Sequence, residues 1–205
     1  MTMPNTMTVH LIDDDDGVRE ALTILLTEGG FTVRSYRSGT DFLATFETAG
    51  RGCIVSDIRM PGIDGLELQQ RLKASKSSFP LIFITGHGDI QMAVQAMREG
   101  ALNFIEKPFD DNLLMDAVQS ALKSLDARPV SNEAAAAKAH MDTLTPRERE
   151  VLDCLVQGKP NKITALDLGM SIRTVEVHRA RIMQKMDANS LSELVRMVLS
   201  AQALI

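Results

Sequence analysis

The chain has 205 residues, of which 44% are hydrophobic and 24% charged. This composition is typical of a globular protein and excludes collagen-like, mucin-like and wholly disordered chains. No apolar run approaches the ~18 residues that a membrane-spanning helix needs, and the first nine residues lack the pattern of a signal peptide. Cys53 and Cys154 are far apart and flanked by aliphatic residues, which favours buried thiols over a disulfide or a zinc site. We therefore expect a cytoplasmic protein of one large or two small domains.

The net charge of −5 is unevenly distributed. Residues 1–123 carry 11 Lys and Arg against 17 Asp and Glu, whereas residues 124–205 carry 11 against 10. Within residues 159–185 the balance is six basic against two acidic residues. A basic stretch in an acidic protein is a candidate site for a polyanion, although many solvated helix faces are as basic.

Residues 1–123 alternate short apolar runs with amphipathic stretches, which predicts five β-strand and α-helix units. The predicted strands are Val9–Ile12, Thr32–Tyr36, Cys53–Ser56, Leu81–Thr85 and Ala101–Ile105. The predicted helices are Val18–Leu26, Thr40–Phe46, Leu66–Leu72, Ile90–Met97 and Leu113–Leu122. Units of this size imply a parallel sheet with helices on both faces, and ligands then bind beyond the carboxyl ends of the strands.

Residues 124–141 are predicted to form a linker. Pro129 and the following Ser-Asn pair are typical of a connecting segment, whereas Glu133–Ala139 has high helix propensity and could form a short rod. The pattern leaves open whether the linker is a rod or a flexible tether.

Residues 142–205 are predicted to form four short helices. Thr145–Glu148 is a capping box with proline at the first helical position. A second helix runs from Asn161 to Leu168 and ends at Gly169, and a third is capped by Ser171 and extends to Met186. Ser190 and Glu193 predict another capping box, and the tight turn at Gly169 fits a helix-turn-helix.

Polar residues follow four of the predicted strands, at the point where each strand ends. Asp13 and Asp14 follow the first, Asp57 the third, Thr85 the fourth and Lys107 the fifth. Three carboxylates converging in one pocket require a cation, and Mg²⁺ suits them because it takes a few carboxylates and leaves room for phosphate oxygens. A hydroxyl and an ammonium group opposite would stabilise a transferring phosphoryl group, so one carboxylate is a candidate nucleophile for an aspartyl-phosphate.

Each of these residues also has a structural explanation. Asp13–Asp16 could be a solvated helix N-terminus, where carboxylates favour the helix dipole. Asp57 could form a turn before Pro61, and Lys107 could be a surface lysine beside Pro108. The functional interpretation rests on all of them falling at strand ends in the right order.

The motifs Asp13-Asp14, SDIRMPGIDG (Ser56–Gly65), ITG (Ile84–Gly86) and FIEKPF (Phe104–Phe109) resemble the receiver domain of two-component response regulators. The resemblance covers about residues 7–123 and implies a 2-1-3-4-5 strand order. It implies that Asp57 accepts phosphate from a sensor histidine kinase. It further implies an Mg²⁺ site made of Asp13, Asp14, Asp57 and the backbone carbonyl of Arg59. Thr85 would bond the phosphoryl group, Lys107 would pair with its charge, Phe104 would be the switch aromatic, and the Lys107-Pro108 peptide would be cis.

A second family shares part of this chemistry. Asp14-Asp15-Asp16-Gly17-Val18 resembles the nucleophile motif of haloacid-dehalogenase-type phosphatases, which also use an aspartyl-phosphate and Mg²⁺. Such a phosphatase needs another acidic motif after its lysine, and only Asp110, Asp111 and Asp116 follow Lys107, on a predicted helix. An Mg²⁺-dependent phosphatase is therefore the weaker alternative.

The third helix of the C-terminal segment carries basic residues at three- and four-residue steps, so it could enter the major groove of DNA or be an ordinary basic surface helix. LTPREREVL (Leu144–Leu152), GKPNK (Gly158–Lys162) and TVEVH (Thr174–His178) resemble a LuxR-type helix-turn-helix. That resemblance implies DNA as ligand, with the recognition helix near Ile172–Lys185. The candidate DNA-binding residues are Lys159, Asn161, Lys162, Arg173, Thr174, Glu176, Val177, His178, Arg179, Ala180 and Arg181. The chain departs from the family at Ile163-Thr164, where an acidic residue and isoleucine are usual, which puts the packing of the second helix in doubt.

A receiver (1–123), a linker (124–141) and a LuxR-type module (142–205) together resemble the FixJ subfamily of transcriptional activators. VHLIDD (Val9–Asp14), GHGD (Gly86–Asp89), AMREGALNFIEKPF (Ala96–Phe109) and RTVEVHRA (Arg173–Ala180) carry this resemblance. It implies an oxygen-sensing FixL-like kinase, promoter DNA and RNA polymerase as partners, and control of nitrogen-fixation or microaerobic genes. Before phosphorylation the receiver would mask the DNA-binding module or its partner surface. Phosphorylation would change the face formed by the fourth helix and fifth strand, with Val94 and Arg98 near its exposed edge, and that face would dimerise. A FixJ-subfamily regulator that answers another signal is the nearest alternative.

Overall fold

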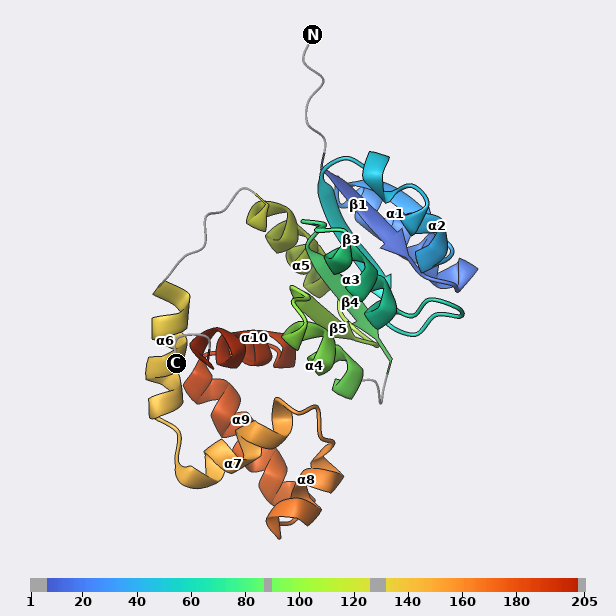
Figure 1. The fold of residues 1–205 in the computed structure, drawn as a ribbon. Helices are drawn as coiled ribbons and strands as arrows, with labels where there is room; N and C mark the ends of the chain where they lie inside the picture. The colour runs from blue at the N-terminus through green and yellow to red at the C-terminus, as the bar shows by residue number, and fades with distance from the viewer. Residues whose placement is uncertain (1–6, 87–89, 126–131, 203–205) are drawn as a thin grey trace. The chain divides into compact units, whose positions relative to one another are not determined.

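The computed structural model describes residues 7–86, 90–125 and 132–202 (Figure 1). The chain divides into two compact units, residues 1–89 with 100–128 and residues 90–99 with 129–205. Part of the predicted linker, residues 126–131, and residues 87–89 of the GHGD motif lie outside the described residues.

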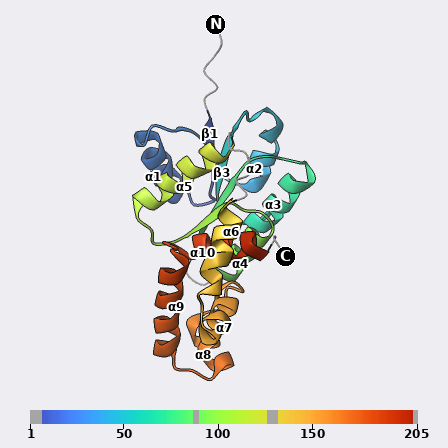
Figure 2. The same ribbon diagram turned by 90° about the vertical axis from the view of Figure 1, so that its left-hand side faces the viewer.

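The first unit is built on a five-stranded parallel sheet in the order β2-β1-β3-β4-β5, which confirms the expected 2-1-3-4-5 order. The strands are β1 (Thr8–Ile12), β2 (Thr32–Tyr36), β3 (Gly52–Asp57), β4 (Leu81–Thr85) and β5 (Asn103–Glu106). The helices of this unit are α1 (Asp16–Glu28), α2 (Gly39–Leu43), the 3₁₀ turn η1 (Phe46–Thr48), α3 (Gly65–Ala74) and α5 (Asp111–Ser124). Helices α1 and α5 cover one face of the sheet, and α2 and α3 lie on the other (Figure 2).

The segment predicted as one helix over Thr40–Phe46 is shorter than expected. Helix α2 ends at Leu43, and η1 follows after two residues. Thr45 and Thr48 each donate a hydroxyl hydrogen bond to the backbone carbonyl three residues back. Side-chain bonds of this kind compete with the helical backbone pattern, which accounts for the break.

The two faces of the sheet are packed differently. On the α1 and α5 side, aliphatic residues of alternate strand positions, among them Val9, Leu11, Val55 and Ile84, form one buried cluster. On the other side, His10 lies in an aromatic group with Tyr36, Phe42 and Phe79, at ring-centroid distances of 5.3 to 6.0 Å from His10. Successive residues of β1 therefore point to opposite faces, as the pleat of a strand requires.

Among the described residues of the second unit, all regular secondary structure is helical. It consists of α4 (Ile90–Arg98), α6 (Asn132–Asp142), α7 (Pro146–Leu155), α8 (Asn161–Leu168), α9 (Ile172–Met186) and α10 (Leu191–Gln202). Helices α7 to α10 are the four helices expected from the sequence. Because these helices are short, their stability depends on packing against one another.

Helix α6 resolves the alternative that the sequence left open for its part of the linker. Its residues 132–142 form a helix that packs against α10 and α9, and Ala137 is 1% exposed. The imidazole of His140 forms a hydrogen bond with the carbonyl of Met186, the last residue of α9, at 3.0 Å. This part of the predicted linker therefore belongs to the fold of the C-terminal unit.

Local capping signals position the C-terminal helices. The Thr145–Glu148 capping box is present in both directions, Ser171 caps α9, and Gly169 ends α8 with a φ of +62°. At α10 the prediction is only half right: the Glu193 N–H donates to Ser190, but the Glu193 carboxylate accepts from the N–H of Asn189 instead of Ser190. Among the described residues, no helix is both long and apolar enough to cross a membrane.

Candidate phosphoacceptor and DNA-binding sites

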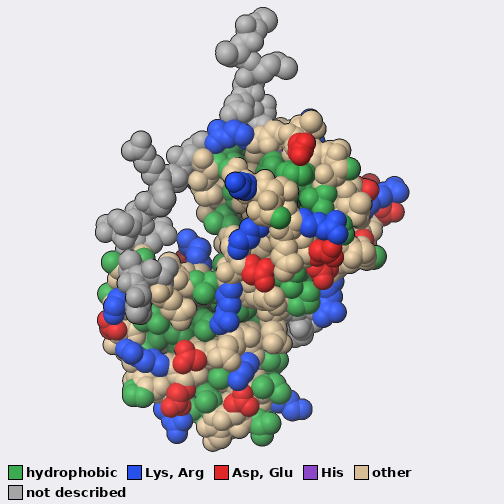
Figure 3. Space-filling model, viewed as in Figure 1, with side chains coloured by type: hydrophobic (Ala, Val, Ile, Leu, Met, Phe, Trp, Pro, Cys, Tyr) green, Lys and Arg blue, Asp and Glu red, His purple; other side chains and the backbone are tan. Residues whose placement is uncertain are grey.

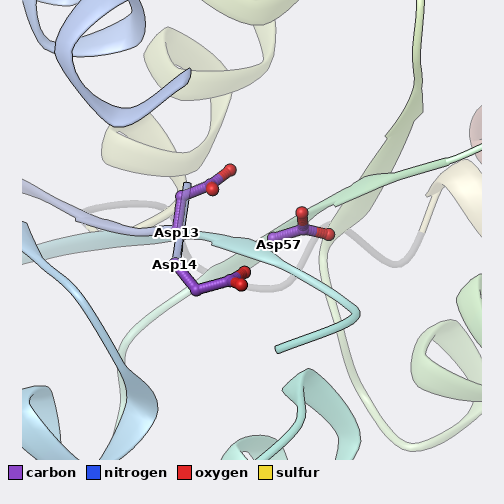
Figure 4. A group of neighbouring side chains, drawn as sticks. All are labelled: Asp13, Asp14 and Asp57. Carbon is purple, nitrogen blue, oxygen red and sulfur yellow. The ribbon is translucent and has the colours of Figure 1, made fainter. Parts of the chain in front are cut away.

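Three aspartates converge at the carboxyl end of the sheet (Figure 4). Asp13 and Asp14 follow β1 and Asp57 ends β3, and one carboxylate oxygen of each lies within 4.8 Å of the others. Asp13 is 1% exposed, Asp57 is half-buried and Asp14 is exposed. Strands β1 and β3 are hydrogen-bonded neighbours, so the residues after them are brought together by the sheet itself.

Lys107 and Thr85 complete this acidic pocket. The Lys107 ammonium lies 3.3 Å from Asp57 Oδ2 and 3.6 Å from Asp13 Oδ2. The N–H of Lys107 donates to the carbonyl of Thr85 at 2.8 Å, which ties the end of β5 to the end of β4. Thr85 is fully buried, and the Lys107-Pro108 peptide is cis, as expected. The structure therefore brings together the side chains of Asp13, Asp14, Asp57 and Lys107. It links Thr85 to this group through the backbone of Lys107.

The run Asp13–Asp16 divides between two roles. Asp15 is the N-cap of α1 and accepts hydrogen bonds from the N–H groups of Gly17 and Val18 at 2.8 and 3.0 Å. Asp16, in the first turn, forms an ion pair with Arg19. The helix-terminus interpretation thus holds for the second pair of aspartates and the pocket interpretation for the first.

The loop after Asp57 keeps close to the strand. Gly62 has a φ of +78°, a conformation that side chains rarely adopt. A Cβ on Gly65 would lie 2.6 Å from Phe83 Cε1 and 3.1 Å from the carbonyl oxygen of Asp57. The Arg59 N–H donates to Asp57 Oδ1 at 3.2 Å, so the loop holds one oxygen of the central carboxylate.

The donor set fits Mg²⁺. Asp13 Oδ2 is buried and has no hydrogen-bond partner, and the Lys107 ammonium is 3.6 Å from it. A buried carboxylate oxygen in this position can be satisfied by a bound cation. Burial raises the pKa of Asp13, with nearby Asp57 and Asp14 adding to the rise and the Asp15 N–H and Lys107 opposing it. Oxygen-only coordination by a few carboxylates beside open solvent is the pattern that Mg²⁺ prefers.

Phe104 lies on β5 opposite Phe83 and is 5% exposed. Val94 and Arg98, the residues expected at a dimer face, lie on α4. Arg98 is exposed, but Val94 is 2% exposed, so the expectation that it lies at an exposed edge is wrong for this structure. The reason is that α4 packs against α10 within the second unit.

Helix α9 presents most of the expected DNA-binding residues to solvent. Val175, Ile182 and Met186 are its buried positions. Exposed side chains on the helix are those of Arg173, Thr174, Glu176, Val177, Ala180 and Arg181, while His178 and Arg179 are half-buried. Val177 is apolar and 44% exposed. An exposed valine is more consistent with contact to a base edge than with a face that meets only water.

Three of the candidate DNA-binding residues have partners inside the module: Lys159, Asn161 and Arg179. Arg179 Nη1 donates to Asn161 Oδ1 at 2.7 Å, which joins α9 to the start of α8. The Lys159 ammonium forms an ion pair with Asp167 at 2.7 Å. Lys162 is exposed. On the face seen in Figure 3, basic and acidic side chains are interspersed.

The departure at Ile163-Thr164 has a structural outcome. Thr164 is fully buried and its hydroxyl has no hydrogen-bond partner, whereas Ile163 is 43% exposed. The smaller residue occupies the buried position of α8 and the larger one faces solvent. The helix bounds expected from the sequence are unaffected.

The sequence did not reveal two interactions that support these sites. Arg19 donates to the backbone carbonyl of Asp13, and Lys185 forms an ion pair with the buried Glu148 at 2.7 Å. The first is signalled only by its i,i+3 spacing from Asp16. The second pair is 37 residues apart, so no local pattern could reveal it.

Comparison with known proteins agrees with this geometry. Residues 9–119 match the family described as response regulator receiver domain, and residues 142–198 match bacterial regulatory proteins of the luxR family. The chain therefore belongs to the response regulators that join a receiver to a LuxR-type DNA-binding domain.

Within this class the chain is of the FixJ type. It is 48% identical to the transcriptional regulatory protein FixJ of Azorhizobium caulinodans over 200 residues, 97% of this chain and 95% of that protein. The crystal structure of full-length FixJ from B. japonicum is similar, with 43% identity, a TM-score of 0.57, and coverage of 98% of this chain and 100% of that one. The C4-dicarboxylate transport transcriptional regulatory protein DctR of Rhodobacter capsulatus is 39% identical over 94% of this chain and 99% of that protein.

Proposed function

We propose that Asp57 accepts a phosphoryl group from a sensor histidine kinase and that this event controls promoter binding by α9. The observation that carries the proposal is the convergence of Asp13, Asp14 and Asp57 within 4.8 Å, with Lys107 3.3 Å from Asp57. The buried Oδ2 of Asp13 has no hydrogen bond, and its ion-pair partner is the Lys107 ammonium 3.6 Å away, which leaves a bound cation as the group that would satisfy it.

The transfer follows from the positions of the side chains. A carboxylate oxygen of Asp57 attacks the phosphorus of the kinase's phosphohistidine. The nitrogen–phosphorus bond breaks, the imidazole keeps the electron pair, and an acyl phosphate remains on Asp57. Mg²⁺, held by Asp13, Asp14, Asp57 and the carbonyl of Arg59, would neutralise charge on the phosphoryl oxygens.

Lys107 and Thr85 act on the product. The Lys107 ammonium, already close to Asp57, pairs with a phosphoryl oxygen. The Thr85 hydroxyl, whose nearest partner is the Gly86 carbonyl at 3.4 Å, is weakly held and can turn to donate to the phosphoryl group. Phe104 on the neighbouring strand then changes its packing, and the receiver forms a homodimer in which the exposed Arg98 of α4 takes part. Slow hydrolysis of the acyl phosphate resets the protein, which is a regulator and not an enzyme acting on other substrates.

Dimerisation accounts for DNA binding. Two recognition helices on adjacent half-sites raise affinity without new contacts in either module. Arg173, Arg181 and Lys162 contact phosphates, and Glu176, Val177 and Ala180 face base edges. The dimer activates transcription together with RNA polymerase.

The proposed kinase partner is FixL-like and oxygen-sensing, and the proposed targets are nitrogen-fixation or microaerobic genes. This follows from the identity to FixJ proteins. The alternative is a FixJ-type regulator that answers another signal, which the 39% identity to DctR supports. Transcript profiling of a deletion strain at low and normal oxygen distinguishes them: oxygen-dependent loss of nitrogen-fixation transcripts supports the first proposal, and an oxygen-independent regulon supports the alternative.

The phosphorylation step is tested by intact mass after treatment with acetyl phosphate and Mg²⁺. We expect one phosphoryl adduct on the wild type, none on Asp57→Asn, and an unchanged adduct on Asp116→Asn, a matched change on the exposed side of α5. An adduct that persists in Asp57→Asn would move the nucleophile to another aspartate and revive the phosphatase alternative.

The switch is tested by promoter-fragment binding before and after phosphorylation. The phosphorylated wild type is expected to bind more tightly and as a dimer. If unphosphorylated Asp57→Asn bound as tightly as the phosphorylated wild type, the proposed switch would be wrong.

A further inference from the structure

Arg19, in the first turns of α1, reaches back to the end of β1 beside the acidic pocket. Its side chain is 11% exposed, unusual for an arginine near the start of a surface helix. The Nη1 atom donates to the backbone carbonyl of Asp13 at 2.8 Å, and the Nη2 atom donates to the carboxylate of Asp16. One guanidinium group therefore joins the end of β1 to the start of α1.

The bond from Arg19 is one of three that hold Asp13. The Asp13 N–H donates to the carbonyl of Tyr36 at 3.3 Å, and Asp13 Oδ1 accepts from the N–H of Asp15 at 2.9 Å. With the carbonyl held by Arg19, the peptide plane between Asp13 and Asp14 is fixed. Asp13 Oδ2 makes no hydrogen bond, and the Lys107 ammonium lies 3.6 Å from it.

Asp14 depends on this peptide plane more than Asp13 does. Its carboxylate is exposed, and among the described residues it makes no hydrogen bond or ion pair. The direction of the Asp14 side chain is therefore set mainly by its backbone. Whatever fixes the Asp13–Asp14 peptide also sets where the Asp14 carboxylate can meet a cation.

We propose that Arg19 is a positioning residue for Mg²⁺: by holding the Asp13 carbonyl it orients the Asp13 and Asp14 carboxylates for the cation. The inference rests on the metal site proposed above. It concerns the geometry of the guanidinium and not its charge, because a bare positive charge beside the pocket would repel Mg²⁺. The Asp16 carboxylate pairs with Arg19 and so offsets part of that charge. The same carboxylate oxygen also lies 3.8 Å from Arg37 Nε, so Asp16 is shared between two arginines.

Arginine and lysine differ in a way that makes this testable. A planar guanidinium can bond two acceptors in fixed directions, whereas an ammonium is a point charge on a flexible stem. Arg19→Lys keeps the charge and loses the two-pronged geometry. Arg19→Met keeps the apolar stem and loses both.

The experiment is calorimetric titration of the unphosphorylated full chain with Mg²⁺ at constant ionic strength. We expect the Mg²⁺ dissociation constant to rise about 10- to 100-fold in Arg19→Met, the range seen when groups that orient metal ligands are removed. Arg19→Lys is expected to bind Mg²⁺ at least about 5-fold more weakly than the wild type, within that same range. The matched control is Arg71→Met on α3, which removes an arginine from an i,i+4 ion pair with Glu67 and is expected to bind like the wild type.

A second readout separates positioning from general damage to the fold. With acetyl phosphate as donor, we expect Arg19→Lys to need more Mg²⁺ for half-maximal phosphorylation while its rate at saturating Mg²⁺ stays within about 3-fold of the wild type, because full occupancy restores the site. A lower rate at every Mg²⁺ concentration, with unchanged half-saturation, would indicate a purely structural role and overturn the inference.

The remaining outcomes are also decisive. Tighter Mg²⁺ binding by Arg19→Met, with wild-type binding by Arg19→Lys, would show that Arg19 acts only as a charge and overturn the inference. If Arg19→Met does not fold, the Lys variant decides alone: weaker binding supports positioning and wild-type binding overturns it. Failure of the wild type to bind Mg²⁺ would instead overturn the proposed metal site itself.

Discussion

At the scale of single residues, the four consecutive aspartates show how position overrides residue type. Asp13 and Asp14 are directed into the pocket by the end of β1, whereas Asp15 caps α1 and Asp16 pairs with Arg19. Successive side chains of an α-helix are rotated by about 100°, whereas those of a strand alternate between its two faces. The aspartates at the end of the strand and those at the start of the helix therefore face different environments. The chemistry of the site thus depends on where the strand ends.

His10 provides a residue-scale prediction for pH dependence. Burial, with Arg34 as a secondary cause, lowers its pKa to about 4, from 6.5 in an unfolded chain. As pH falls, the unfolded state takes up the proton first, so the free energy of unfolding decreases between pH 6.5 and about 4. We expect this histidine to account for a loss of about 2 kcal/mol between pH 7 and pH 5.

The measurement is urea unfolding followed by the fluorescence of Tyr36, the single tyrosine of a chain without tryptophan. Tyr36 lies in the same unit, with its hydroxyl 3.2 Å from His10 Nδ1. The His10→Leu variant should lack this part of the pH dependence. Parallel losses in the wild type and the variant would show that other groups are responsible.

At the scale of elements, the close approach of α3 to β3 depends on Gly65. A Cβ there would lie 2.6 Å from Phe83 and 2.9 Å from the Cα of Ile58. We expect Gly65→Ala to lower the free energy of unfolding by about 1–3 kcal/mol, the cost of overpacking, and to slow phosphorylation because the loop after Asp57 must move. Gly17→Ala is the comparison, since an added Cβ there would contact only one atom, the Asp15 carboxylate oxygen at 3.3 Å. Equal stability of the two variants would contradict this account.

Helices α7 and α9 are joined by an ion pair between the buried Glu148 and the half-exposed Lys185. Glu148 is 3% exposed, accepts from Lys185 at 2.7 Å and completes the capping box with Thr145. The bond from Lys185 is the main cause that lowers the pKa of Glu148 to about 2, from 4.5. Its stabilising contribution is therefore present above pH 4.5 and is lost as pH falls from 4.5 towards 2.

We expect Glu148→Gln to destabilise the C-terminal unit by about 1.5–3 kcal/mol at pH 7, as for other hydrogen bonds to charged groups. The difference from the wild type should shrink below pH 4.5. Glu150→Gln, which breaks the exposed pair with Arg147, is the matched control and should cost less than about 1 kcal/mol. Denaturant unfolding followed by far-UV circular dichroism measures both, and a full effect persisting at pH 3 would count against the ion pair.

At the scale of the whole molecule, an acidic protein binds DNA through a small part of its surface. The net charge is −5, yet Arg173, Arg181 and Lys162 are exposed and, among the described residues, none of the three forms an ion pair. Each phosphate neutralised by such a residue releases counterions, so affinity falls with salt in proportion to the number of contacts. Repulsion between the acidic remainder and DNA is screened by salt, so it partly opposes this dependence.

We expect Arg181→Ala to weaken binding to duplex DNA at every sequence tested and to reduce the slope of log affinity against log salt by about 1. Arg147→Ala, which removes a charge that pairs with Glu150 on α7, should leave the slope unchanged. Fluorescence anisotropy at several salt concentrations measures the slope. An unchanged slope in Arg181→Ala would remove this residue from the phosphate contacts.

The sequence by itself determined the order of the elements, the residues at the strand ends and most helix boundaries, because these depend on local patterns: alternating runs, caps at Thr145 and Ser171, and a left-handed glycine at Gly169. Only the tertiary structure decided which aspartates face the pocket, that α6 packs against α10, that Arg19 holds the Asp13 carbonyl, and that Lys185 reaches Glu148. These features join side chains to groups that chain distance does not pair, and their energy comes from burial and from hydrogen bonds shielded from water. Such contacts exist only once the strands and helices have packed.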